Sequence, residues 1–441
     1  GVVAGSDAAG QSNTYRTTLS GLRPGSYRLT AKATDGGTPT SRQTSQPVTI
    51  TVAEPEPTTL QGFWDPRFFP LNLGEDTPIV EYGLAVDPDG NVYSGSATQA
   101  TGPSLRIRKW SGCNWTTPVQ GTSAGNVFSL LWHRSQLYAG GILNGPNSGW
   151  DVSRLNGSTL ISVGNQLGYS TTSSSPFVYK GVRTLQSAGG FLYAGGDFES
   201  AGGNTNVQFL ARLDATESTW LPVGNGLNNT VRAIAEFEGA LYAGGYFTAA
   251  GGNSNIQYLA KLVGNEWQPV GSGVDGPVLA LFPHQGRLFV GGEFTTAGGY
   301  TNASRLAVWD GSRWGTVGSG VSDGTEDNGL GWLTSAYGSW EAATRVDALA
   351  ARGNELYVAG DFTKAWNGGS PVAANYIARA VWSEADQSWT WSALDGGLSL
   401  DDPFFDSATN RLEHARALAI REHTHDSGYD VLVTGLFSNA G

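Results

Sequence analysis

The stretch LYAGGYFTAAGG, residues 241–252, occurs in nearly the same form at two other places in the chain. These are LYAGGDFESAGG at 192–203 and LFVGGEFTTAGG at 288–299, and a shorter echo, LYVAGDFT, lies at 356–363. The side chains of the first residues of the phrase are expected to point alternately to the two faces of a sheet, as in a β-strand. Repetition of one phrase indicates a repeat architecture, so the period of the repeat decides the fold.

Alignment on the start of each repeat gives seven units within residues 60–441. They begin near Tyr82, Val127, Val182, Val231, Val278, Val346 and Ala415. A complete unit holds four short β-rich segments, which in the fourth unit are VRAIAEF, ALYAGGYF, IQYLAKLVG and EWQPVGSG. Four short strands in about 45–50 residues are typical of a β-propeller blade. The sequence therefore predicts an all-β fold, a seven-bladed β-propeller with four-stranded blades.

The last unit is incomplete, because it stops at VLVTGLFSNAG after its second segment. FWDPRF at 63–68 has the Trp-x-Pro pattern that recurs in the fourth segment at Trp220 and Trp267. We expect Trp64 to lie on the outer strand of the last blade, since closure of the ring removes an exposed sheet edge. The chain contains no methionine, and both ends interrupt a pattern. We therefore expect a longer polypeptide, with the missing third strand beyond Gly441.

The repeated glycines and tryptophans have an architectural interpretation. The two glycines of LYAGG leave no side chain where neighbouring blades converge, which allows close approach of the backbones. Trp220, Trp267, Trp314 and Trp389 recur near the fourth segment, and we expect them to fill the wider gap between blades. A motif present in most units is expected to build the ring rather than to hold one ligand.

Residues 1–53 have a different texture. The stretch GSYRLTAKATDGGTPTSRQTSQPVTITV alternates apolar and polar residues and predicts strands over 26–33 and 46–52. It resembles the C-terminal half of bacterial immunoglobulin-like or cadherin-like modules, which implies a small, partial β-sandwich-like module. Residues 54–59 predict a short semi-rigid linker, because proline restricts the backbone.

The repeats themselves resemble known propellers. Their LYxGGxF pattern is similar to that of kelch-like propellers of bacterial secreted proteins, of the type found in the central domain of galactose oxidase. It is also similar to the repeats of fungal cortical polarity-marker proteins. Units three to five match best, while the first departs most, with Ser94 and Ser96 in place of the usual residues. The resemblance implies a propeller and an extracellular or cell-surface location, but no reaction, because propellers host many unrelated functions.

Composition excludes several classes of function. The chain of 441 residues has a formal net charge of −12, so it lacks the basic footprint of a nucleic-acid-binding protein. No apolar run approaches the roughly 18 residues of a membrane span, and we expect no membrane insertion. Cys113 is the single cysteine, so neither an internal disulfide nor a cysteine metal cluster is possible.

The candidate binding residues lie in long loops. In a four-stranded meander with strands A to D, the B–C loops and the D–A crossovers emerge on one face. The long crossovers cover about 165–181, 320–345 and 395–414, and the longest B–C loop covers 363–375. Unrepeated aromatic and acidic residues in long loops on a rigid scaffold are typical of binding sites. The predicted binding residues are Trp332, Tyr337, Trp340, Trp366, Asp323, Glu326, Asp327, Phe404 and Phe405. The alternative is that these loops cover one another and fill the channel mouth.

The other patterns in the sequence are weaker indications of a functional site. DPDGN at 87–91 lacks the glutamate of a calcium loop and predicts a hairpin turn, so we expect no cofactor. EHTHD at 422–426 offers two imidazoles without a third ligand, and we expect no metal site. The residues that follow the repeated glycine pairs would form a partial ring of carboxylates, although capping of local turns explains each acid separately. These residues are Asp197, Tyr246, Glu293 and Asp361. No catalytic motif is present, and no catalytic residue is assigned.

Three functions remain open. The leading hypothesis is an extracellular or cell-surface recognition and adhesion scaffold that binds a glycan or a protein through the long-loop face. The second is a structural subunit of a surface layer, sheath or filament, which would self-associate. The third is a polysaccharide-active enzyme that uses carboxylates in the same loops, which the missing catalytic motifs disfavour.

Overall fold

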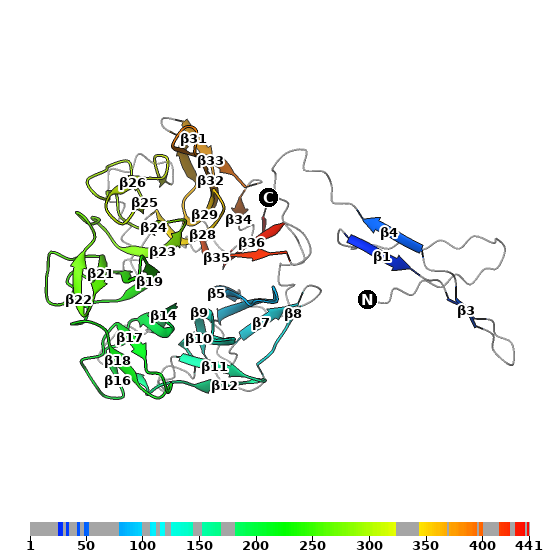
Figure 1. The fold of residues 1–441 in the computed structure, drawn as a ribbon, viewed down its shortest axis with the longest axis horizontal. Coiled ribbons are helices and arrows are strands. Elements are labelled where there is room, and N and C mark those ends of the chain that lie inside the picture. The colour runs from blue at the N-terminus through cyan, green and yellow to red at the C-terminus, as the bar shows by residue number, and fades with distance from the viewer. Residues whose placement is uncertain are drawn as a thin grey trace, which may run out of the picture. The chain divides into compact units, whose positions relative to one another are not determined.

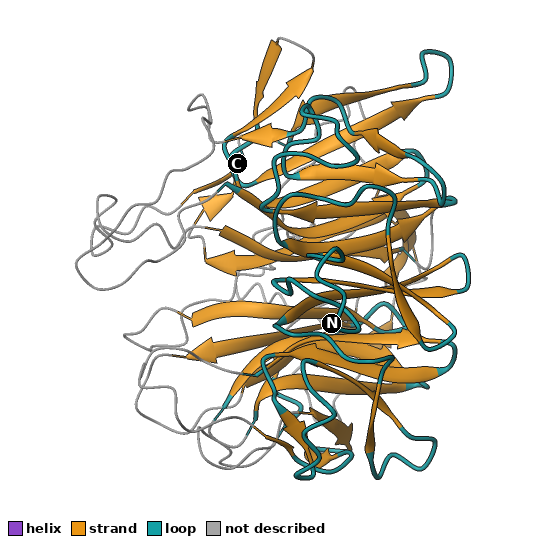
Figure 2. Ribbon diagram, turned by 90° about the vertical axis from the view of Figure 1, so that its left-hand side faces the viewer, coloured by secondary structure: helices purple, strands orange, loops and turns teal. Residues whose placement is uncertain are grey.

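The computed structural model describes residues 25–29, 32–34, 42–44, 48–52, 79–98, 106–111, 115–119, 125–143, 152–168, 181–322, 344–367, 370–394, 397–399, 414–423, 428–436 and 439–440. The chain divides into two compact units, Gly1–Gly62 and Phe63–Gly441. All elements in these ranges are strands joined by loops (Figure 2). The same ranges contain no helix with the length and hydropathy to cross a membrane.

The described residues of the first unit form two short antiparallel pairs of strands. One pairs β1 (Gly25–Leu29) with β4 (Val48–Val52), and the other pairs β2 (Lys32–Thr34) with β3 (Arg42–Thr44). The predicted strand over 26–33 is thus divided between β1 and β2.

The described residues of the second unit form six four-stranded antiparallel sheets, each made of strands that are close in the chain. The first three are β5 (Ile79–Val86), β6 (Val92–Thr98), β7 (Arg106–Trp110) and β8 (Trp115–Thr116); β9 (Asn126–His133), β10 (Gln136–Ile142), β11 (Val152–Asn156) and β12 (Thr159–Ser162); β14 (Val182–Ala188), β15 (Phe191–Gly196), β17 (Leu210–Leu213) and β18 (Trp220–Pro222). The next three are β19 (Val231–Phe237), β20 (Ala240–Gly245), β21 (Leu259–Val263) and β22 (Glu266–Pro269); β23 (Val278–His284), β24 (Arg287–Gly292), β25 (Leu306–Trp309) and β26 (Trp314–Thr316); β28 (Arg345–Arg352), β29 (Glu355–Asp361), β32 (Ile377–Ser383) and β33 (Ser388–Ala393).

These sheets are the blades of a β-propeller. The first strand of each blade is innermost, and each innermost strand packs against that of the next blade (Figure 1). After β28 the series continues with β35 (His414–Glu422), which packs against both β28 and β5 and so closes the ring. Closure leaves no exposed edge along the inner strands.

The number of complete blades differs from the prediction. Six four-stranded blades are present in the described residues rather than seven, and at the remaining place β35 pairs only with β36 (Tyr429–Leu436). Trp64, which we expected to close this last blade, lies outside the described residues. The first repeat of the propeller begins at Glu81, one residue before Tyr82. Glu81 pairs with Ser96 in the same way as Val231, the start of the fourth repeat, pairs with Gly245.

The two glycines of the repeated phrase have separate structural roles. A Cβ added to Gly244 would lie 2.5 Å from Cγ1 of Val278, the residue that begins the next blade. A Cβ added to Gly245 would lie 2.1 Å from the carbonyl oxygen of Thr230 in its own blade. The first glycine therefore sets the spacing between blades, and the second allows the backbone of strand B to approach a β-bulge in strand A.

The second half of the phrase fixes the start of strand C. Phe247 is fully buried, and its carbonyl oxygen accepts a hydrogen bond of 2.8 Å from the N–H of Tyr258. The carbonyl oxygen of Tyr258 accepts a bond of 3.0 Å from the N–H of Gly245. Tyr258 has a φ of 61°, in the left-handed region. Gly244, Gly245 and Phe247 of the opening phrase are therefore architectural.

The predicted common face of B–C loops and D–A connections is confirmed, because these segments pair with each other. Short strands make three such contacts, between β13 (Leu167–Gly168) and β16 (Ser200–Ala201), between β27 (Val321–Ser322) and β30 (Lys364–Asn367), and between β34 (Leu398–Ser399) and β37 (Asn439–Ala440). β30 also pairs with β31 (Ser370–Ala373). We call this the loop face.

The tryptophans occupy the predicted place between blades, with one correction. Trp220, Trp267 and Trp314 are buried against Gly164, Gly224 and Gly271 of the preceding blades. In the sixth blade the equivalent residue is Trp391, whose Nε1 donates to the carbonyl oxygen of Val317 at 3.3 Å. The prediction of Trp389 was wrong because the C–D hairpin of this blade is longer. Trp389 lies further out, opposite Trp382.

Candidate binding site at the axis of the propeller

Each innermost strand has a β-bulge near its start, which leaves one residue without a cross-strand partner. In β19, Val231 pairs with Gly245 and Ala233 pairs with Gly244, so Arg232 is the bulged residue. The equivalent residues of the seven strands are Tyr82, Phe128, Arg183, Arg232, Leu279, Asp347 and Arg416. We call these seven residues the axial ring.

Side chains of the axial ring contact one another across blade boundaries. The rings of Tyr82 and Phe128 meet edge to face with their centres 5.4 Å apart. The guanidinium of Arg183 lies 4.6 Å from the ring centre of Phe128, and that of Arg416 lies 5.6 Å from the ring centre of Tyr82. Aromatic faces attract cations, so these contacts orient two guanidinium groups beside the axis.

Asp347 is shared by two arginines. Nε of Arg345 lies 3.0 Å from one carboxylate oxygen of Asp347, and Nη1 of Arg416 lies 3.6 Å from the other. Arg345 also lies 3.9 Å from Glu293, which accepts a hydrogen bond of 2.8 Å from the hydroxyl of Tyr246. Because little of the Asp347 and Arg345 side chains is exposed, this ion pair is better shielded from solvent than a surface pair.

The positive charges of this cluster influence one another. Burial lowers the pKa of Arg345, but the charges of Asp347 and Glu293 outweigh it, so the pKa is raised. Burial also lowers the pKa of Arg416, and there Asp347 does not compensate, because Arg345 and Arg232 add like charges. Arg232 and Arg416 belong to blades on different sides of the ring. Each occupies the bulged position of its innermost strand.

The acidic residues that follow the repeated glycine pairs interact with arginines. Asp197 accepts a hydrogen bond of 2.7 Å from Nε of Arg183 and one of 2.6 Å from the hydroxyl of Thr230. Asp361 acts on Arg345 through its charge. Arg183 therefore serves Asp197, whereas Arg345 serves both Glu293 and Asp361. In the described ranges, no group of three or more His, Cys, Asp or Glu side chains is arranged to hold a metal ion.

The hairpin interpretation of residues 87–91 is confirmed. The side chain of Asp87 accepts hydrogen bonds from the N–H groups of Asp89 and Asn91, at 3.0 and 2.8 Å, and one of 3.2 Å from the hydroxyl of Tyr93. His423 lies 3.2 Å from Asp430 of the neighbouring strand, whereas His425 lies outside the described residues.

Most of the predicted binding residues fall outside the described ranges. These are Asp323, Glu326, Asp327, Trp332, Tyr337, Trp340, Phe404 and Phe405. Trp366 is described, in β30 on the loop face. It is partly buried, and its carbonyl oxygen accepts a hydrogen bond of 3.0 Å from the N–H of Ser319. Its backbone therefore helps to join the B–C hairpin to the preceding blade.

The axial ring was missed from the sequence, although a signal was present. The identity of the bulged residue varies from unit to unit, whereas the residue before it is a valine in five of the seven units. Val231 and Ala233 flank Arg232, and Val278 and Ala280 flank Leu279. A variable position inside a recurrent frame is a site where the scaffold leaves the side chain free to serve another purpose.

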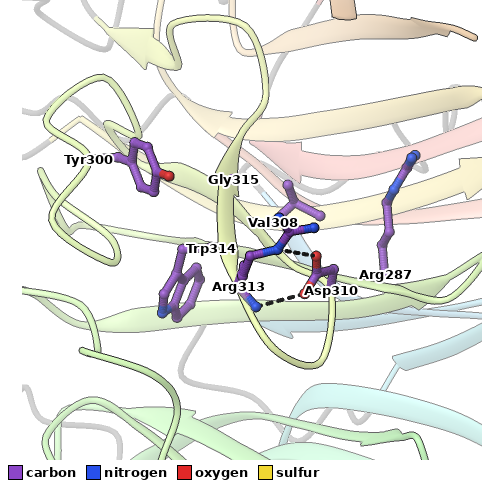
Figure 3. A pocket seen from close by; sticks show the side chains of 7 residues that line it. All are labelled: Arg287, Tyr300, Val308, Asp310, Arg313, Trp314 and Gly315. Carbon is purple, nitrogen blue, oxygen red and sulfur yellow. Dashed lines mark hydrogen bonds and ion pairs between the residues drawn. The ribbon is translucent and has the colours of Figure 1, made fainter. Parts of the chain in front are cut away.

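A second candidate is a shallow cavity of about 230 Å³ at the outer side of the fifth blade (Figure 3). Its lining residues are Arg287, Tyr300, Val308, Asp310, Arg313, Trp314 and Gly315. Asp310 accepts hydrogen bonds from the backbone of Ser312 and Arg313 and so caps the β25–β26 hairpin. Ligand pockets usually enclose about 300–1,000 Å³. The cavity is therefore smaller than a typical ligand site.

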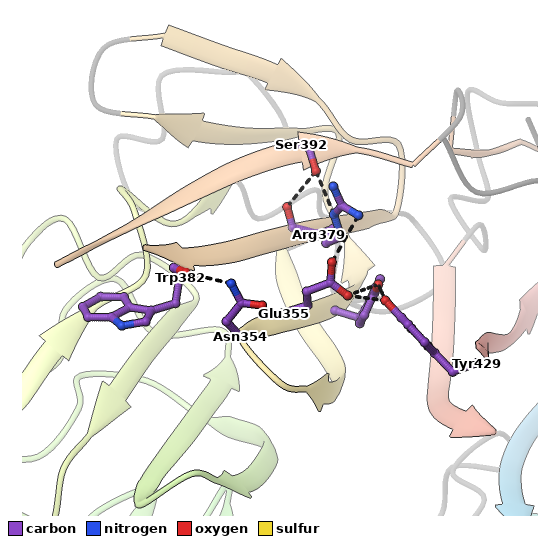
Figure 4. A network of polar contacts seen from close by, with 7 residues as sticks. Asn354, Glu355, Arg379, Trp382, Ser392 and Tyr429 are labelled. Atoms are coloured by element: carbon purple, nitrogen blue, oxygen red, sulfur yellow. Dashed lines mark hydrogen bonds and ion pairs between the residues drawn. The ribbon is translucent and has the colours of Figure 1, made fainter. Parts of the chain in front are cut away.

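A third polar group joins the sixth blade to β36 (Figure 4). Glu355 accepts hydrogen bonds from the hydroxyls of Tyr357 and Tyr429, and its other oxygen lies 3.4 Å from Arg379. Burial and these contacts raise the pKa of Tyr357 and Tyr429. Arg379 also donates to Ser392 at 3.2 Å. The donors and acceptors satisfy one another, which is typical of a structural clamp.

Comparison with known proteins gives no family. No protein-family model matches the chain, and no curated protein matches it in sequence. The solved structures that it resembles include the computationally designed Ika8 protein, at 13% identity and a TM-score of 0.39 over 82% of this chain and 95% of that one. They also include the RRP9 WD40 repeats, at 14% identity and a TM-score of 0.42 over 74% of this chain and 85% of that one. The β-propeller assignment rests on the strand order and the closed ring of inner strands.

Proposed function

We propose that this protein is a recognition and adhesion scaffold that binds a glycan or a protein through the loop face of its propeller. The observation that carries the proposal is the axial ring. At one recurrent position the blades present aromatic, cationic, acidic and aliphatic side chains, although the residue before that position is a valine in five of the seven units. Scaffolds commonly keep their framework and vary the residues that contact a partner.

Three described carboxylates do not have the raised pKa that a general acid needs. A general acid needs a raised pKa, whereas the pKa values of Asp214, Asp275 and Asp310 are lowered. Backbone N–H groups donate to Asp214 and Asp310, and at Asp275 the hydroxyl of Thr295 together with backbone N–H groups outweighs burial. A polysaccharide-active enzyme and a self-associating subunit of a surface layer, sheath or filament remain the alternative proposals.

The finer features of the sequence interpretation belong to the same proposal. We propose an extracellular or cell-surface location, a kelch-like bacterial origin for the repeats and an immunoglobulin-like character for residues 1–53. We also propose that β35 and β36 are the inner half of a seventh blade. Support comes from the β34–β37 pairing, in which Leu398 faces Ala440 as Leu167 faces Ala201 in an earlier unit.

Binding of the purified protein to a glycan array and to surface extracts tests the proposal. The informative variants replace Trp332, Tyr337 and Trp340 together by alanine, and Trp366 alone by alanine. Val263→Ala is a matched control, because Val263 is an exposed apolar residue in a C–D hairpin, at the opposite end of the strands from the loop face. We expect the loop-face variants to lose most binding while the control keeps it.

Two results would contradict the proposal. Equal binding by the wild type and all loop-face variants would remove the loop face as the binding surface. Turnover of a bound polysaccharide by the wild type, detected as newly formed reducing ends, would favour the enzyme instead.

A further inference from the structure

The outer cavity of the fifth blade lies where this blade differs from the others (Figure 3). Its lining includes Val308 of strand C, which pairs with Gly315 of the outer strand β26. At these two places the five other four-stranded blades carry a long basic side chain and a residue larger than glycine. The five pairs are Lys109–Thr116, Arg154–Ile161, Arg212–Leu221, Lys261–Gln268 and Arg379–Ser392. Of the six four-stranded blades in the described residues, only the fifth leaves this place open.

The missing side chain at Gly315 joins the two sides of β26 into one cavity. In Figure 3 the rings of Tyr300 and Trp314 lie to one side of Gly315, and Val308 and Arg287 lie to the other. All five residues line the same cavity. A Cβ added to Gly315 would lie 3.1 Å from Cγ1 of Val308, so a longer side chain at this position would occupy part of the space.

A second departure from the repeat places an aromatic ring beside the cavity. At the place of Tyr300 the third and fourth units have Asn204 and Asn253. The side-chain oxygen of each asparagine accepts a hydrogen bond of 3.0 Å from the N–H two residues later, which stabilises the turn. Tyrosine has no acceptor in reach of that N–H, and Tyr300 is 49% exposed. The turn therefore does not require this ring, which is available to stack on a sugar.

The charged residues of the cavity add up to one positive charge in an acidic protein. Arg313 is 84% exposed, and its Nε lies 3.6 Å from Asp310, so this exposed ion pair contributes little. The guanidinium of Arg287 lies 4.4 Å from the ring centre of Trp382, and within the described ranges it forms no ion pair. Two guanidinium groups therefore line the cavity together with one carboxylate.

The two oxygens of the Asp310 carboxylate are used differently. Its Oδ1 accepts hydrogen bonds of 2.9 and 2.7 Å from the N–H groups of Ser312 and Arg313, and one of 2.8 Å from the hydroxyl of Ser312. Its Oδ2 lies on the side of Arg313, and the Asp310 side chain is 41% exposed. The cavity thus offers an acceptor for a hydroxyl group as well as donors for an anion.

We propose that the outer cavity of the fifth blade binds one unit of an acidic sugar, a sugar ring that carries a carboxylate or sulfate group. Arg313 and Arg287 hold the anionic group, because guanidinium donors form a planar fork that matches oxyanions. The sugar ring stacks on Tyr300, and one of its hydroxyls donates to Asp310. This inference goes beyond the proposed function, since it assigns a second binding surface, on the outer strand of a blade.

The lining favours a sugar over other anions. An inorganic anion or an acidic side chain meets the negative charge of Asp310 without supplying a donor, whereas a sugar supplies both an anionic group and hydroxyl donors. The cavity of about 230 Å³ is below the usual range of about 300–1,000 Å³, which suits a single ring. An acidic peptide is the competing occupant.

The test measures calorimetric affinity for four probes: glucuronate, glucose 6-sulfate, glucose and a tetraglutamate peptide. Gly315→Gln fills the cavity with the residue that the fourth blade has as Gln268, and Arg313→Gln removes one charge. Lys261→Gln is the matched control, because it removes the same charge from the adjacent blade. We expect glucuronate or glucose 6-sulfate to bind the wild type and the control, and glucose to bind neither. Gly315→Gln is expected to abolish this binding, and Arg313→Gln to weaken it about three- to fivefold, the effect of one exposed charged contact.

A second readout separates binding from a structural role. Without ligand, Gly315→Gln is expected to melt close to the wild type, because the fourth blade accommodates glutamine at this place and only Val308 has to shift. Tyr300→Asn restores the residue of the third and fourth units, so it is expected to keep the fold while weakening the sugar. The anionic sugar is expected to raise the melting temperature of the wild type but not that of Gly315→Gln, since only binding to the folded state stabilises it.

Several outcomes would overturn the inference. One is binding of neither anionic sugar to the wild type, and another is equal binding by the wild type, Gly315→Gln and Tyr300→Asn. Equal affinity for glucose and glucuronate would remove the role of the arginines, and binding of tetraglutamate alone would replace the sugar by an acidic peptide. If Trp366→Ala loses binding to a glycan array while Gly315→Gln binds both anionic sugars like the wild type, the inference fails and the proposed recognition function stands.

Discussion

Ala359 and Ala415 lie in one buried cluster at the junction of the sixth blade with β35. In the five preceding junctions the equivalent position of strand B is a glycine that meets a valine of the next innermost strand, as Gly244 meets Val278. At the sixth junction both residues change together, from glycine and valine to two alanines. The combined volume of the two side chains is constrained, because blades pack at the density of a protein core.

This relationship predicts strong coupling between the two positions. Ala415→Val is expected to destabilise the protein by about 1–3 kcal/mol, because the larger side chain meets the Cβ of Ala359. Ala359→Gly alone is expected to cost about 0.5–1 kcal/mol through backbone entropy. The double variant restores the pair used elsewhere, so it should be more stable than Ala415→Val. Urea unfolding of all four proteins measures the coupling, and strictly additive effects would contradict it.

The two glycines of LYAGG should respond differently to alanine. Gly244→Ala brings a Cβ against the side chain of Val278, so the companion change Val278→Ala is expected to rescue much of the loss. Gly245→Ala meets the carbonyl oxygen of Thr230, a backbone atom that no side-chain truncation removes. We expect Gly245→Ala to be the more destabilising variant. Thermal melting decides, and rescue of Gly245→Ala by Val278→Ala would show that the two positions are not distinct.

The repeat made the fold predictable. LYAGG recurs because each junction needs the same close approach, and period and alternation together determine strand, blade and ring. The common face of the B–C and D–A loops followed from the antiparallel order of a blade. The number of complete blades was harder to predict, because the last unit has the residues of strands A and B only, and a count of repeat starts does not show whether a blade is complete.

The candidate site was not predictable in the same way. Tyr82 and Arg416 are 334 positions apart in the chain, and only ring closure brings their side chains together. Ala415 was identified as the start of a unit, but the variable residue after it was not recognised as a bulged position. Sequence reasoning favoured long loops with aromatic residues instead, since exposure and composition are visible there.

Trp391 and Trp389 provide a test of the corrected register in the sixth blade. Trp391 is buried, donates to Val317 and lies where a Cβ on Gly318 would reach it. Trp389 is only partly buried, against Phe289. We therefore expect Trp391→Ala to cost about 3–5 kcal/mol, the range for a large buried aromatic residue, and Trp389→Ala to cost clearly less. Denaturant unfolding compares the two, and the reverse order would restore Trp389 to the inter-blade position.

The last prediction concerns alkaline pH and the buried hydroxyl of Tyr138. This hydroxyl donates to Glu217 at 2.7 Å, and burial together with that bond raises the pKa of Tyr138 to about 12. An unfolded tyrosine has a pKa of about 10. The folded state therefore binds the proton more tightly, so the resulting stability is complete below about pH 10 and is lost as the pH rises toward 12.

Tyr138→Phe removes this contribution and should be less stable than the wild type by about 1.5–3 kcal/mol near pH 8, the range for a hydrogen bond to a charged group. Between about pH 10 and 12 the difference in unfolding free energy should shrink, because the wild type alone loses the bond. Tyr300→Phe is the control, since Tyr300 is 49% exposed. The unfolding free energy of this variant should stay close to that of the wild type throughout the pH range. A Tyr138→Phe difference that remains constant across this range would show that the hydroxyl does not hold its proton through Glu217.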